Sequence, residues 1–84
     1  MSNYTTWKIT YTISAQDDGE FSVPKQICDL LNTGSGEMLR VCIRNGNMTL
    51  HTEDHLREER KFYGEQFKNF IKQGDELRVT VARI

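Results

Sequence analysis

The sequence predicts a single β-rich α+β domain, and three observations support this fold class. The chain has 84 residues, the length of one domain with a small hydrophobic core. Apolar and polar residues alternate strictly over residues 6–13, as in a half-buried strand. One octapeptide pattern occurs twice, as GEMLRVCI at 36–43 and as GDELRVTV at 74–81. Each half of the chain therefore contains a Gly-acid turn that leads into a strand.

The two octapeptides suggest two similar halves, about residues 6–50 and 51–84. An apolar run precedes each copy, at 27–31 and at 67–71, which favours a duplicated unit with a pseudo-two-fold β structure. The alternative is that any turn followed by a half-buried strand produces such a pattern. No linker or low-complexity stretch divides the chain, so we expect one domain over residues 1–84.

Composition and charge exclude several classes of protein. The 11 basic and 12 acidic residues give a formal net charge of −1, so a nucleic-acid surface would have to be a local basic face. No apolar run is long enough for a transmembrane helix, and residues 1–8 lack the apolar segment of a secretory signal. The two cysteines do not have the pattern of a disulfide framework for a small secreted domain. We therefore expect a cytoplasmic protein with reduced thiols and no membrane partner.

The first predicted elements are a strand at 6–13, a turn at 16–19 and a strand at 20–23. Together they predict a hairpin over 6–23, because the turn contains Asp-Asp-Gly. The apolar residues of the first strand, which we expect to face the core, are Trp7, Ile9, Tyr11 and Ile13.

A short helix is predicted next, over residues 24–32. Pro24 suits the first helical position, where its missing N–H has no partner to lose. Ile27, Leu30 and Leu31 follow at helical spacing and give one apolar face.

A second hairpin follows the helix. Residues 38–44 alternate as a strand, Asn45-Gly46 favours a type I′ turn, and residues 47–51 return. The residues expected to face the core are Leu39, Val41, Ile43, Met48 and Leu50. The outward positions of the first strand are Arg40, Cys42 and Arg44.

The last part of the sequence predicts a longer helix within 53–72 and a final strand. Thr52 resembles an N-cap, and apolar residues recur at helical spacing, with Gly64 as a break. The charged stretch 56–61 is typical of a solvated helix face. Leu77, Val79 and Val81 are the inward side of the last strand.

The order of elements between residues 19 and 50 is similar to that of a known family. The segment reads Gly, a strand ending in Val-Pro-Lys, a helix ending in Leu-Leu, Gly-Glu, a strand, a turn and a strand. This order resembles the AbrB/SpoVT-like transcription-factor domain, with a degenerate second copy near 67–81. The resemblance implies a swapped-hairpin β-barrel, usually built from two chains, that binds double-stranded DNA.

Two features of this chain depart from the family pattern. The chain continues past the motif, so that either one chain supplies both halves of the barrel or the tail is an addition. Where family members commonly carry arginine, this sequence has Glu20, Cys28 and Asp29. Carboxylates repel phosphates, which favours the alternative of a protein-interaction or dimerisation module that lost DNA binding.

If the chain is the bacterial-type regulator that the resemblance implies, the remaining basic residues are its candidate DNA contacts. They are Lys8, Lys25, Arg40 and Arg44. The alternative is that they are ordinary surface charges that protect strand edges.

Other chemistry is poorly supported by the sequence. Cys28, Cys42, His51 and His55 lack the Cys-x-x-Cys spacing of zinc sites. No pattern indicates a catalytic nucleophile or a phosphate-binding loop. We expect no enzymatic activity, no metal and no cofactor. Tyr4, Trp7 and Tyr11 could stack on bases, but core packing is expected for the last two.

Overall fold

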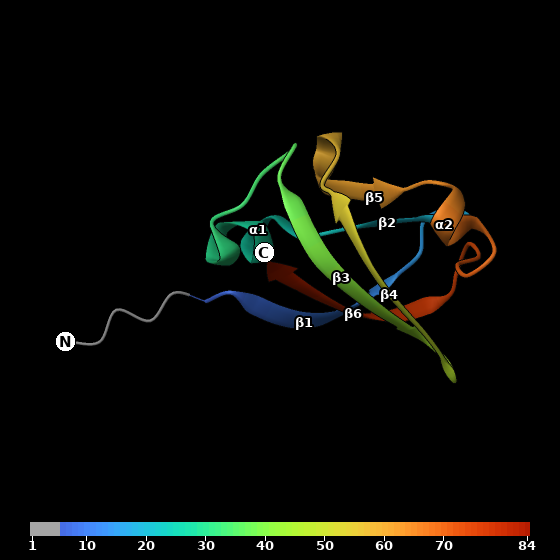
Figure 1. Ribbon diagram of the computed structural model, residues 1–84. Coiled ribbons are helices and arrows are strands. Elements are labelled where there is room, and N and C mark those ends of the chain that lie inside the picture. Colours follow the sequence, from blue (N-terminus) through green and yellow to red (C-terminus); the bar gives the residue numbers. More distant parts are fainter. Residues whose placement is uncertain (1–5) are drawn as a thin grey trace.

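The computed structural model describes residues 6–84, which form two antiparallel sheets. The larger sheet has the strand order β1-β6-β3-β4 (Figure 1). Its strands are β1 (Lys8–Ser14), β3 (Met38–Asn45), β4 (Met48–His55) and β6 (Glu76–Arg83). The smaller sheet pairs β2 (Glu20–Ser22) with β5 (Lys61–Tyr63). Helical elements in this part of the chain are α1 (Lys25–Leu31), the 3₁₀ turn η1 (Glu58–Arg60) and α2 (Glu65–Lys68).

The hydrophobic core lies on one face of the four-stranded sheet. Alternate residues of the two central strands are buried there, namely Leu39, Val41, Ile43, Leu77, Val79 and Val81. Phe21 of β2 stacks on Phe62 of β5 at a ring-centroid distance of 5.4 Å, and Phe67 of α2 meets Phe21 edge-on at 5.6 Å. All of these residues belong to one buried cluster. The smaller sheet and the helices therefore cover the same face of the larger sheet.

The pairing register brings the two octapeptides side by side at the centre of the sheet. Cys42 of β3 is the register partner of Thr80 of β6, and both are the seventh residue of their octapeptide. Loop contacts follow the same two-fold pattern. The N–H of Ala15 donates to the carbonyl of Asp75, and the N–H of Leu56 donates to that of Glu37. Segment β1–β3 is thus related to segment β4–β6 by an approximate two-fold rotation.

Most of the predicted elements are confirmed. The helix expected at 24–32 is α1, the strand at 38–44 is β3, and the last strand is β6. The Asn45-Gly46 turn joins β3 to β4, as expected for a sequence that favours positive φ.

The predicted hairpin over 6–23 is wrong. β1 pairs with β6, and β2 pairs with β5, so the two segments belong to different sheets. The turn between them is held by a distant part of the chain, because the N–H of Gly19 donates to the carbonyl of Ile71 at 2.9 Å. Non-local backbone hydrogen bonds thus replace the local pairing that the alternation suggested.

The predicted longer helix within 53–72 is also wrong. Its first residues continue β4, where they complete eight register pairs with β3, and its middle residues form η1 and β5. Only Glu65–Lys68 is α-helical, beginning after Gly64. Both helices are therefore short. Met48, expected in the core, is 53% exposed, because it is the first residue of β4 and lies beside the turn that precedes this strand.

Gly19 should tolerate a side chain less well than Gly46. Both have positive φ, at 69° and 61°, where a Cβ is unfavourable by about 1–2 kcal/mol. A Cβ at Gly19 would also lie 3.0 Å from Lys68 Cα, whereas Gly46 has open space. We expect Gly19→Ala to lower the free energy of unfolding clearly more than Gly46→Ala in urea denaturation. Equal losses would contradict the close packing of Gly19 on α2.

Asp75 should make stability depend on pH. Its carboxylate accepts hydrogen bonds from the Lys72 N–H and the Asn45 amide, and these bonds lower its pKa. A depressed folded pKa stabilises the fold above the unfolded value of about 3.9 and loses this effect as pH falls further. We expect Asp75→Asn to be less stable than the wild type at neutral pH, with the difference shrinking below pH ~4. If the difference in stability between the two proteins does not change with pH, the negative charge of Asp75 is not its cause.

Candidate nucleic-acid interface

The face of the large sheet opposite the core carries the polar side chains of all four strands. We call it the outer face and define it by three rows of register partners. They are Lys8–Ala82–Arg40–Glu53, Thr10–Thr80–Cys42–His51 and Thr12–Arg78–Arg44–Thr49. Because side chains alternate along each strand, the register that buries the core also sets these rows.

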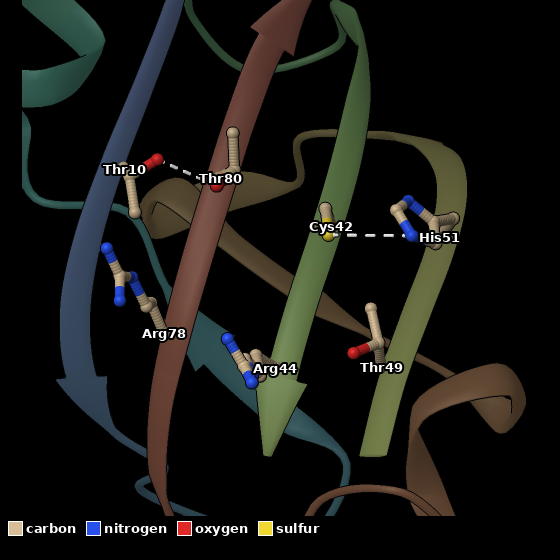
Figure 2. Close-up of a pocket in the computed structure, with 7 residues that line it drawn as sticks. All are labelled: Thr10, Cys42, Arg44, Thr49, His51, Arg78 and Thr80. Carbon is tan, nitrogen blue, oxygen red and sulfur yellow. Dashed lines mark hydrogen bonds between the residues drawn. The ribbon is translucent and has the colours of Figure 1, made fainter. Parts of the chain in front are cut away.

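Arg44 and Arg78 form an uncompensated pair of cations on this face. They are direct register partners on β3 and β6, both are exposed, and Figure 2 shows them on neighbouring strands. Among the described residues neither forms an ion pair with a carboxylate, whereas Arg40 pairs with Glu53 at 3.4 Å. Like charges directly opposite each other destabilise a sheet. Two guanidinium groups so placed suit a bound anion, to which each can donate two hydrogen bonds.

A shallow pocket of about 320 Å³ surrounds this arginine pair. Its lining is Thr10, Cys42, Arg44, Thr49, His51, Arg78 and Thr80 (Figure 2). The hydroxyl groups of Thr10 and Thr80 are hydrogen-bonded at 2.8 Å, and Cys42 Sγ lies 3.9 Å from His51 Nε2. The lining offers hydrogen-bonding groups and positive charge, and it contains no carboxylate.

A second pocket, of about 290 Å³, adjoins the first. Both pockets are lined by Cys42, His51 and Thr80, and the second adds Trp7, Lys8, Arg40 and Ala82. Together they form one groove across the outer face, which we call the outer groove. It has an aromatic ring at one end and the arginine pair at the other.

The expectation that Trp7 faces the core is wrong, since its side chain is 56% exposed and lines the outer groove. Trp7 precedes β1, and its carbonyl accepts a hydrogen bond from the Arg83 N–H. It thus lies at the end of the sheet, outside the buried cluster. Tyr11 is half-buried in accordance with the prediction; its hydroxyl donates to the Ser22 carbonyl, and burial raises its pKa. Tyr4 lies outside the described residues.

The structure brings three of the four predicted DNA contacts together. Lys8, Arg40 and Arg44 lie on the outer face. Lys25 does not, because it begins α1, where its ammonium pairs with Asp29 at 3.0 Å. Sequence reasoning missed Arg78, although the repeat contained the signal, since Arg78 occupies the position of Arg40 in the second octapeptide.

The four zinc candidates do not gather into one site. Cys28 is a buried residue of α1, where desolvation raises its thiol pKa, whereas Cys42 and His51 lie on the outer face. Within residues 6–84, no group of three or more His, Cys, Asp or Glu side chains is placed to hold a metal ion. No helix in this part of the chain has both the length and the apolar character needed to cross a membrane.

No protein-family model, curated protein or solved structure matches this chain.

Removing one member of the arginine pair should not destabilise the protein. We expect Arg78→Thr to raise the free energy of unfolding at low salt by up to about 1 kcal/mol, because it relieves the cross-strand repulsion. The gain should shrink at high salt, which screens exposed charges. Arg40→Thr is the matched control, since it removes an arginine that has a partner. A loss of stability in Arg78→Thr, measured by urea denaturation, would show that Arg78 is compensated.

Proposed function

We propose that the protein is a DNA-binding regulatory protein of AbrB-like type, which holds phosphates on its outer face. The observation that carries this proposal is the directly opposed, uncompensated pair Arg44 and Arg78. Lys8 extends the positive charge along the same groove. The resemblance of residues 19–50 to AbrB/SpoVT-like domains supports the same function from the sequence.

We also propose that one chain supplies both halves of a swapped-hairpin barrel. The strand pairing supports this architecture, because β1 pairs with β6 and β4 pairs with β3. Each edge strand, β1 or β4, thus pairs with the central strand of the other half, where the halves are β1–β3 and β4–β6. In this reading the segment after residue 50 replaces a second chain.

Glu20 and Asp29, the acidic residues that depart from the family pattern, do not lie where they would repel phosphates bound to the outer face. Glu20 lies on β2 and pairs with Lys61 at 3.3 Å, and Asp29 lies on α1 and pairs with Lys25. Neither residue belongs to a row of the outer face. Phosphates bound at Arg44 and Arg78 would therefore approach a surface without these carboxylates.

Binding of this kind should depend steeply on salt. Each phosphate that a cation neutralises contributes about 0.9 to the slope of log K against log salt. Arg40 is already paired with Glu53 on this face, so the three other cations, Lys8, Arg44 and Arg78, predict a slope of about −2.7. A slope near zero would exclude phosphate contacts as the main source of affinity.

Charge reversal tests the proposed interface. We expect Arg44→Glu/Arg78→Glu to abolish binding of labelled DNA in fluorescence anisotropy at ~50 mM salt. Lys68→Glu/Lys72→Glu is the matched control, because it makes the same change in net charge on and after α2 and should retain most of the binding. Both variants should keep the wild-type fold by circular dichroism.

The Lys25→Glu variant separates the two possible DNA surfaces. If Lys25→Glu abolishes binding while the arginine double variant binds normally, the interface lies on α1 and the outer face is not used.

The second candidate function is a protein-interaction or dimerisation module. One observation favours it: β1 and β4 are the outer strands of the large sheet, and such edges can pair with another chain. Met38 and Met48, on the β3–β4 hairpin, are also exposed. This function would be favoured if the purified chain sediments as a dimer and does not bind DNA at low salt.

A further inference from the structure

We infer that the outer groove takes single-stranded nucleic acid, with Trp7 stacked on a base while Arg44 and Arg78 hold a phosphate. The inference rests on the proposed nucleic-acid binding and specifies which form of nucleic acid the groove takes.

Trp7 has the position of a stacking platform. More than half of its side chain is exposed, and it forms one end of a groove rather than part of the core. The Lys8 ammonium lies over its ring, 5.5 Å from the centroid, so a base would stack on the opposite face of the ring with a cation close by. An exposed aromatic ring combined with basic side chains along a groove is typical of surfaces that bind single strands.

The spacing along the groove suits several nucleotides of one strand. The row of Lys8 and the row of Thr12, which contains the arginine pair, are four residues apart on β1. At ~3.3 Å per residue this separation is about 13 Å. The base on Trp7 and the phosphate at the arginine pair would therefore belong to different nucleotides. Between them lie Thr80, Cys42 and His51, of which the hydroxyl and the imidazole can hydrogen-bond to the edges of unstacked bases.

A duplex can use only part of this surface. The bases of a duplex are stacked on one another, so none is free to lie on Trp7 unless the helix opens. Its phosphates can contact the arginine pair, as the proposed function requires. An extended single strand that runs along the β-strands of the outer face can use both the tryptophan ring and the arginine pair.

The single tryptophan of the chain provides a direct measurement. We would titrate the full chain with an oligothymidylate and with a mixed-sequence duplex of equal length at ~50 mM salt, recording Trp7 fluorescence. We expect the single strand to quench the fluorescence and to bind at least about five-fold more tightly than the duplex, because stacking on one aromatic side chain contributes that much or more.

Two variants separate stacking from charge. Trp7→Ala should weaken binding of a labelled single strand about 5- to 100-fold in fluorescence anisotropy, while Trp7→Phe should retain most of the affinity. Duplex binding should be similar in all three proteins. Because Trp7 lies outside the buried cluster, both variants should fold, which circular dichroism verifies.

The outcomes distinguish the inference from the proposed function. Salt-sensitive binding of the duplex without a preference for the single strand, or unchanged single-strand affinity in Trp7→Ala, would overturn the role of Trp7 and leave the phosphate-binding face intact. No salt-sensitive binding of either nucleic acid would overturn both.

Discussion

The pairing of β3 with β6 is the contact on which the rest of the structure depends. These two strands are the centre of the larger sheet, and one register determines both of its faces. On one side it buries Val41 beside Val81, and on the other it places Arg44 opposite Arg78. A shift of one residue would exchange the two faces, placing arginine in the core and valine in water. The core and the candidate interface are therefore consequences of one pairing.

Similar loop contacts extend the β1–β6 pair and the β3–β4 pair. The N–H of Gly74 donates to the Ala15 carbonyl, and the N–H of Gly36 donates to that of Leu56. The backbone is thus nearly two-fold, but the outer face is not. Arg40 and Arg78 occupy equivalent positions of the two octapeptides, whereas the position equivalent to Arg44 holds Ala82 one residue after the second octapeptide. This small side chain lies in the part of the outer groove lined by Trp7. At these two equivalent positions, the first half contributes Arg44 to the arginine pair, and the second contributes space at the aromatic end.

The distribution of charge explains how a chain with a net charge of −1 can have a basic face. Several carboxylates make contacts away from the outer groove: Asp75 joins the end of β3 to the loop before β6, and Asp54 binds Arg57 and Gln66. These carboxylates therefore stabilise loops and strand ends and do not lie at the outer groove. The arginine pair has no such internal partner among the described residues, so its repulsion is left for a ligand to relieve. Stability and binding are therefore expected to oppose each other at this pair.

The sequence by itself determined the elements whose information is local. Pro24 and the Ile27/Leu31 spacing specify α1, Asn45-Gly46 specifies the turn between β3 and β4, and alternation specifies which side of β3 is buried. Only the tertiary structure decided the partners of β1 and β2, because backbone hydrogen bonds between distant segments leave no period in the sequence. The prediction of a long helix within 53–72 is wrong for the same reason. Pairing with β3 outweighs the weak helical pattern over 53–55.

For the site, the alternation placed Lys8, Arg40 and Arg44 on one side of their strands. The exposure of Trp7, the separation of Lys25 and the meeting of Arg44 with Arg78 depend on where strands end and on which strands are neighbours. Those are properties of the assembled sheet, in which residues 34 positions apart become register partners, and the sequence of a single strand does not contain them.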